Sequence, residues 1–139
     1  MVKSKGKIFI ADTDQKSVVL IKDALKAQGY SISSAINGAK ALETIIEQLP
    51  DIIILGMQLP IIDTEKLRDI ISVNPKTDNL ALIFMGTPEQ LRSVSAMGEK
   101  FITNESGSKQ FSVFHTSDPI IVEELVAVLQ EKYFLQRQI

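Results

Sequence analysis

Cysteine is absent from the chain, and His115 is the only histidine. Without cysteine there is no disulfide bond, no thiolate metal site and no cysteine nucleophile. A single histidine cannot build a histidine-based metal site. These absences exclude thiol enzymes and structural zinc modules, and they are compatible with a reducing compartment.

The chain also lacks a concentrated excess of basic residues. Its 139 residues include 15 Lys and Arg against 17 Asp and Glu, which gives a formal net charge of −2. Binding to a nucleic-acid backbone requires such an excess. We therefore expect no direct nucleic-acid partner.

No apolar run near the start of the chain is long enough for a signal peptide or a membrane span. The basic stretch Met1 to Lys7 is followed only by Ile8 to Ala11 before Asp12 interrupts it. A bilayer span needs ~20 predominantly apolar residues. We expect a cytoplasmic protein without membrane contact.

Length and composition predict one globular domain over residues 1–139. Hydrophobic residues make up 45% and charged residues 23% of the chain, which is ordinary globular usage. A chain of this size buries roughly 68 to 70% of its unfolded surface. One core and no second domain are expected.

Short apolar runs alternate with helical patterns along most of the sequence. Residues 7–11, 30–36, 51–55 and 80–85 favour strands, and a helical stripe of apolar residues follows each of the first three. The run 51–55 is the most apolar, as expected of a central parallel strand covered on both faces. This alternation predicts an α/β fold, a flavodoxin-like doubly wound three-layer sandwich with five parallel strands in the order 2-1-3-4-5.

Helix ends are marked by capping residues and breakers. Asn37 and Asp63 are expected to cap helices, Gly29 closes the first helix, and Thr87-Pro88 opens a helix after the fourth strand. Asp118-Pro119 predicts the start of the last helix, which carries an apolar stripe over 121–129.

The fifth strand can be placed in two ways. Residues 100–104 and 111–115 both favour a strand, on either side of a polar turn at 105–108. Either segment can supply strand five, or both can form a hairpin. Phe101, Phe111 and Phe114 are expected to pack in the core or in this hairpin.

The segment Pro50 to Thr64, with the sequence PDIIILGMQLPIIDT, resembles the response-regulator receiver family. The family pattern there is a strand, the phosphoaccepting Asp, and a Pro four residues later. Gly56 stands at the position of that Asp, and Pro60 follows it. The chain is therefore identified as a degenerate, CheY-like pseudo-receiver, with the resemblance covering essentially its whole length.

Further similarities to the family lie after the first, third and fourth predicted strands. They are the acidic turn Asp12-Thr13-Asp14, the acidic Asp63, and Gly86, which lies thirty residues after Gly56 where a switch Ser or Thr usually falls. The family uses two acidic residues and the acceptor Asp to hold Mg²⁺, and a Ser or Thr and a Lys to contact the phosphoryl group. The resemblance thus implies a degenerate phosphorylation site that comprises Asp12, Thr13, Gly56, Gly86, Thr87, Asn104 and His115.

The family's Lys has no counterpart in either alignment of strand five. The 101–104 alignment places Asn104 at that position and the 111–115 alignment places His115 there, while Lys109 could approach from the loop. Thr87 and His115 also have a purely structural interpretation. Thr87 before Pro88 is expected to cap a helix, and His115 is expected to be a strand-end residue.

The residues at the matched positions do not supply the phosphoryl-transfer chemistry that the family resemblance would otherwise imply. Phosphoryl transfer to a protein needs a carboxylate nucleophile, with metal and cationic groups around it, and glycine has no such group. Asp12 with the Thr13 hydroxyl is a poor Mg²⁺ site, so Asp12 is only a weak metal candidate, and no metal or cofactor is expected. Asp12 and Asp14 can instead cap the first helix.

We therefore expect a phosphorylation-independent protein-interaction module rather than an enzyme. In receivers the face formed by helix four, strand five and helix five is the usual output and dimerisation surface, so a signalling protein or a second copy is the expected partner. The alternative is a small ligand held in an emptied pocket bounded by Asp12, Gly56, Gly86 and Thr87. A nucleotide or flavin enzyme is disfavoured, because no Gly-rich loop follows the first strand.

Overall fold

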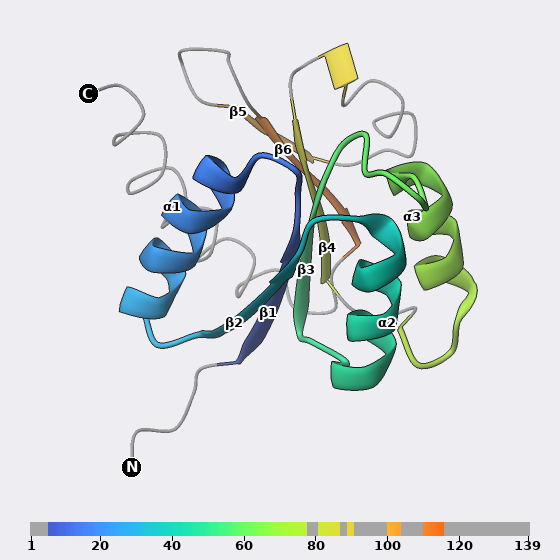
Figure 1. Ribbon diagram of the computed structural model, residues 1–139, viewed down its shortest axis with the longest axis horizontal. Helices are drawn as coiled ribbons and strands as arrows, with labels where there is room; N and C mark the ends of the chain where they lie inside the picture. The colour runs from blue at the N-terminus through green and yellow to red at the C-terminus, as the bar shows by residue number, and fades with distance from the viewer. Residues whose placement is uncertain (1–5, 78–80, 87–88, 91–99, 104–109, 116–139) are drawn as a thin grey trace.

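The protein folds into three layers, with helix α1 on one side of a central sheet and helices α2 and α3 on the other (Figure 1). This structure is a computed structural model, and its described residues are 6–77, 81–86, 89–90, 100–103 and 110–115. The helices are α1 (Gln15–Ala27), α2 (Gly38–Gln48) and α3 (Thr64–Val73). The strands are β1 (Lys7–Ala11), β2 (Ser31–Ala35), β3 (Ile52–Gly56), β4 (Ala81–Gly86), β5 (Lys100–Thr103) and β6 (Gln110–His115). The predicted flavodoxin-like sandwich is confirmed.

The first four strands are parallel and lie in the predicted order β2-β1-β3-β4. The strand beside β4 is β6, which runs antiparallel to it, and β5 pairs antiparallel with β6 at the edge of the sheet. The prediction of a fifth parallel strand is therefore wrong, and the hairpin alternative is confirmed. A hairpin needs only a short connection, whereas another parallel strand needs a crossover of a dozen or more residues.

Three of the predicted caps are present at helix starts. The side chains of Asp14, Asn37 and Asp63 accept hydrogen bonds from the backbone N–H three residues later, at 3.3, 2.8 and 2.9 Å respectively. Each cap satisfies one of the donors that a helix start leaves unpaired. Gly29 closes α1 with a φ of 98°, a conformation that favours glycine. The predicted last helix lies outside the described residues, as does the packing of the three phenylalanines of the hairpin segments.

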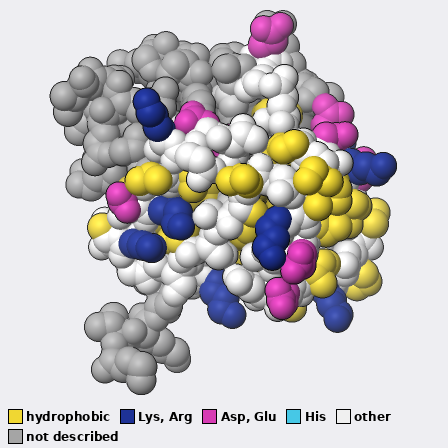
Figure 2. Space-filling view, in the orientation of Figure 1, with side chains coloured by type: hydrophobic (Ala, Val, Ile, Leu, Met, Phe, Trp, Pro, Cys, Tyr) yellow, Lys and Arg dark blue, Asp and Glu magenta, His cyan; other side chains and the backbone are white. Residues whose placement is uncertain are grey.

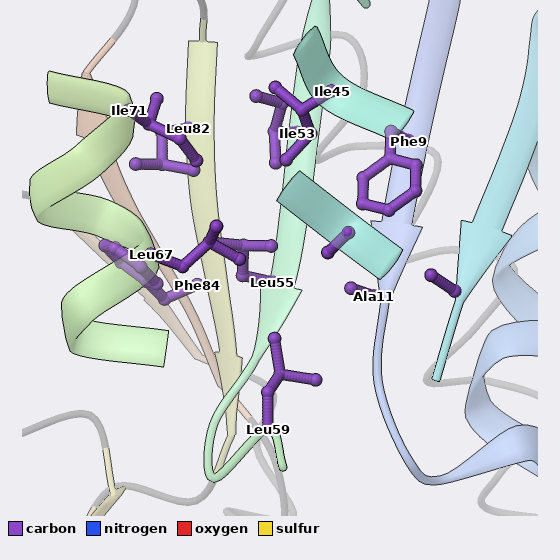
Figure 3. Close-up of a cluster of buried hydrophobic side chains, with 12 residues drawn as sticks. Phe9, Ala11, Ile45, Ile53, Leu55, Leu59, Leu67, Ile71, Leu82 and Phe84 are labelled. Carbon is purple, nitrogen blue, oxygen red and sulfur yellow. The ribbon is translucent and has the colours of Figure 1, made fainter. Parts of the chain in front are cut away.

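The core on the α2–α3 side of the sheet is built from alternate strand residues (Figure 3). Phe9, Ile53 and Phe84 are fully buried there, and they come from three neighbouring strands. Intervening residues such as Ile10 and Ile54 point to the opposite face and are also fully buried. Every residue of β3 is buried, as predicted for the central strand. This packing holds the carboxyl ends of β1, β3 and β4 in a fixed arrangement.

None of the helices in the described part of the chain is both long and apolar enough to cross a membrane.

Candidate functional site at the carboxyl edge of the sheet

Three parallel strands end side by side at the edge where the sequence predicts a site. The sheet register pairs Ala11 with Leu55 and Gly56 with Met85. Asp12 therefore follows β1 beside the end of β3, and Gly86 ends the next strand. In open parallel sheets, ligands and reactive groups collect at this edge. The structure brings Asp12, Gly56 and Gly86 together as predicted.

The place that a side chain at Gly56 would take is filled by Asp12. A Cβ atom built on Gly56 would overlap the Cγ and Oδ2 atoms of Asp12 and would lie 2.9 Å from its Cβ. Asp12 is only 6% exposed, and its Oδ1 accepts a hydrogen bond of 2.9 Å from the backbone N–H of Asp14. A carboxylate from the end of β1 thus stands over the bare backbone of Gly56, the position predicted to correspond to the acceptor.

Gly86 is covered in a similar way. A Cβ atom there would lie 2.9 Å from Oε1 of Gln90 and 2.9 Å from Cγ of Met57. Gln90 is helical, as the predicted helix start at Thr87-Pro88 requires, although Thr87 and Pro88 lie outside the described residues. Among the described residues, neighbouring side chains take up the space beside both glycines; the predicted pocket also includes Thr87, which lies outside the described residues, so a small-ligand role stays a prediction.

A buried threonine ties the end of β3 to the start of α3. The Thr64 hydroxyl donates a hydrogen bond of 2.6 Å to the carbonyl oxygen of Gly56, and it accepts one of 3.4 Å from the backbone N–H of Leu59. Thr64 is 2% exposed. Sequence reasoning missed this role, because a threonine directly after a capping aspartate indicates only that a helix begins.

The loop between β3 and α3 contains two residues with left-handed backbone conformations and is hydrogen-bonded to the start of α2. Gln58 and Ile61 adopt left-handed φ values of 63° and 72°. The backbone N–H of Ile62 donates to the carbonyl of Pro60 at 2.9 Å, which forms a γ-turn around Ile61. Gly38 at the start of α2 donates to the same carbonyl at 2.9 Å, and a Cβ atom on Gly38 would overlap the carbonyl of Ile62. The backbone of this loop therefore packs directly against the start of α2. No side chain at position 38 would fit between them.

A surface hollow of about 680 Å³ lies beside this loop. Its lining residues are Met57, Gln58, Asp63, Thr64, Glu65, Glu89 and Gln90. Met57 and Gln90, which cover Gly86, form part of its wall. The hollow is thus adjacent to the acceptor position and is not the predicted pocket itself.

The magnesium site of a receiver does not fit the residues present. Gly56 stands where the family resemblance predicts the acceptor carboxylate, the exposed Thr13 stands where it predicts the second acidic residue, and Oδ1 of Asp12 accepts from Asp14 N–H. No group of three His, Cys, Asp or Glu side chains in the described part of the chain could hold a metal ion. Octahedral coordination of Mg²⁺ by oxygen ligands therefore has no framework among these residues.

The antiparallel direction of β6 separates His115 from the site. Gln110 pairs with Gly86, while His115 pairs with Leu82 near the opposite end of β4. Four residues of strand separate these positions, which is roughly 13 Å. The placement of His115 in the degenerate site is therefore wrong, and its interpretation as a strand-end residue fits. Asn104 and Lys109 lie outside the described residues.

Comparison with known sequences points to one family. The family profile of the response regulator receiver domain matches residues 8–103. The transcriptional regulatory protein PrrA of Mycobacterium leprae is 25% identical over 124 residues, which are 89% of this chain and 48% of that protein. The sporulation initiation phosphotransferase F of Bacillus subtilis is 25% identical over 119 residues, 86% of each chain. The chain thus spans about half the length of PrrA.

Comparison with solved structures supports the fold. The signal receiver domain of a signal transduction histidine kinase from Syntrophus aciditrophicus superposes with a TM-score of 0.64 at 21% identity, covering 91% of this chain and 90% of that one. At this identity the similarity concerns the fold alone.

Proposed function

Because the chain belongs to the response regulator receiver family, we propose that it acts in two-component-type signal transduction as a phosphorylation-independent protein-interaction module. In this proposal the domain is not an enzyme, and it is a cytoplasmic protein. Its partner is another protein of a signalling pathway or a second copy of the chain.

The observation that carries the proposal is the pairing of Gly56 with Asp12 at the acceptor position. Aspartyl phosphorylation requires a carboxylate that can attack phosphorus in line, with metal and cationic groups around the transferred oxygens. Gly56 has no side chain, and the one carboxylate that reaches its place is buried and accepts a hydrogen bond from Asp14. The nucleophile and the metal framework are thus absent from the described part of the site.

The surface supports a protein partner over a nucleic acid. The face drawn in Figure 2 carries Lys and Arg side chains spread over its middle and lower part, with Asp and Glu side chains among them and along its upper edge. Two large hydrophobic side chains, Ile61 and Val73, are 78% and 80% exposed. Single exposed apolar side chains are ordinary on a protein surface, so the proposed protein partner rests on the family and not on these two residues. We keep the face formed by helix four, strand five and helix five as the proposed docking surface, although its helices lie outside the described residues.

The proposal is tested by offering the chain a phosphoryl donor. The protein is incubated with acetyl phosphate and Mg²⁺, and separately with beryllofluoride and Mg²⁺, and is followed by intact-mass spectrometry and by amide NMR spectra. We expect no added phosphoryl mass and no spectral change. The variant Asp12→Asn identifies the modified group if mass is added, and a phosphorylated wild-type chain would refute the proposal.

A restored acceptor provides the matched control. The double variant Gly56→Asp with Thr13→Asp returns the three carboxylates that the family uses for Mg²⁺. We expect the new side chain at position 56 to displace the Asp12 carboxyl group from its present contact, at a cost in stability, and the folded double variant then to bind Mg²⁺ and to respond to beryllofluoride. A restored variant that ignores Mg²⁺ would count against the alignment of Gly56 with the acceptor.

A further inference from the structure

The side chain of Asp12 and the bare backbone of Gly56 form a contact that we call the interlock. We infer that the interlock is a conformational device that holds the β1–α1 and β3–α3 loops in a single arrangement. In this inference the two loops keep one arrangement and do not switch between two. This inference deepens the proposed function and rests on it.

Steric exclusion is the first support. Positions 12 and 56 cannot both keep their present backbone and carry side chains that point into this space, because a Cβ atom on Gly56 would lie 2.9 Å from the Cβ of Asp12 and would overlap its carboxyl group. A crowded Cβ cannot be relieved by moving only the tip of the aspartate. The glycine is therefore a requirement of the packing as well as a lost acceptor.

Hydrogen bonds on both sides fix the two halves of the interlock. On the β1 side, Oδ1 of Asp12 accepts from Asp14 N–H at 2.9 Å, and its backbone carbonyl accepts from Nε2 of Gln15 at 3.0 Å. On the β3 side, the carbonyl of Gly56 accepts from the Thr64 hydroxyl at 2.6 Å. The interlock thus connects the start of α1 to the start of α3 through buried contacts.

At the end of the neighbouring strand β4, the side chains of Gln90 and Met57 cover Gly86 as Asp12 covers Gly56. Oε1 of Gln90 and Cγ of Met57 each lie 2.9 Å from where a Cβ of Gly86 would be. The residue that follows Gly56 therefore reaches across to cover Gly86. Both positions that lost a polar side chain relative to the receiver pattern are closed by neighbours.

A double-mutant cycle between positions 12 and 56 tests the interlock. Urea unfolding is measured for the wild-type chain, Gly56→Ala, Asp12→Ala and the double variant. We expect Gly56→Ala to raise the unfolding equilibrium constant about tenfold in the wild-type chain, as overpacking of a core does. In the Asp12→Ala background the same change should have a smaller effect, of about threefold, because the overlap with the carboxyl group is gone and only the contact of 2.9 Å with the Cβ at position 12 remains.

Two further variants keep the test decisive. Asp12→Ser shortens the side chain but retains a hydroxyl that can accept from Asp14 N–H, and it replaces Asp12→Ala in the cycle if that variant does not fold. If Gly56→Ala itself does not fold, rescue of folding by Asp12→Gly, which removes every side-chain atom at position 12, supports the interlock. Lack of rescue overturns it, as does an equal cost of Gly56→Ala in all backgrounds.

Gly38→Ala is the matched control, because its Cβ would overlap the backbone carbonyl of Ile62 rather than a side chain. Its cost should not change when Asp12 is replaced. The effect of the interlock on the conformation of the β3–α3 loop is measured by amide hydrogen exchange of residues 57–63. We expect exchange at least tenfold faster in Asp12→Ala than in the isosteric Asp12→Asn, and equal rates would refute the device.

The outcomes also separate this inference from the proposed function. A cycle without coupling removes the interlock but leaves Gly56 without an acceptor carboxylate. A phosphorylated wild-type chain removes the proposed function but does not alter the cycle.

Discussion

Replacing Thr64 with valine removes one hydroxyl from the interior while keeping the shape of the side chain. That hydroxyl donates to the Gly56 carbonyl at 2.6 Å from a residue that is 2% exposed. A buried hydrogen bond contributes about 1 kcal/mol net, and a carbonyl left without its donor costs about 1–3 kcal/mol. We expect Thr64→Val to lower the free energy of unfolding by about 2 kcal/mol.

Urea denaturation followed by circular dichroism measures this loss. With a urea dependence of about 2 kcal/mol per molar, the midpoint should fall by about 1 M. Thr64→Ser keeps the hydroxyl and should retain most of the stability. Thr13→Val changes an exposed threonine and should stay within about 0.5 kcal/mol of the wild type. If Thr64→Val is as stable as Thr64→Ser, the hydrogen bond to Gly56 does not stabilise the fold as we infer.

Three other substitutions probe the loops around the site by the same urea assay. Asp63→Ala removes the cap of α3 and should cost about 1 kcal/mol, whereas Asp63→Asn should cost little, and equal effects would contradict a capping role. Gly38→Ala should cost about 1–3 kcal/mol or more, because its Cβ meets the Ile62 carbonyl; a neutral result would place the loop elsewhere. Ile61→Gly should raise stability by about 1 kcal/mol, because a branched side chain at a φ of 72° is strained, and a lower midpoint would argue against that conformation.

The sequence predicts the frame of the site well because local chemistry determines most of it. The unbroken apolar run Ile52 to Leu55 is short and rich in β-branched residues, which favours a buried strand, and that strand ends at Gly56. Capping by Asn37 and Asp63 follows from side-chain length and position alone. Each of these features depends on a few neighbouring residues, so the sequence contains nearly all the information needed.

Long-range contacts account for what the sequence does not predict. The direction of β6 depends on pairing with β4, and this direction moves His115 away from Gly86. The covering of Gly86 by Gln90 and Met57 depends on side chains that meet only after the strands are assembled. From the sequence, a missing side chain predicts a hollow in the structure. In the folded chain, the neighbouring side chains determine whether that hollow is filled.

The contact between Asp12 and Gly56 also bears on how the lost acceptor could return. In the proposed function, position 56 lacks the family's acceptor carboxylate, and introducing a carboxylate there places a new side chain where Asp12 already lies. The returning residue would first destabilise the fold, and phosphorylation could compensate only after Asp12 had rotated and a metal had bound. A chain with a carboxylate at position 56 therefore has to give up the present contact with Asp12 before it can use that group.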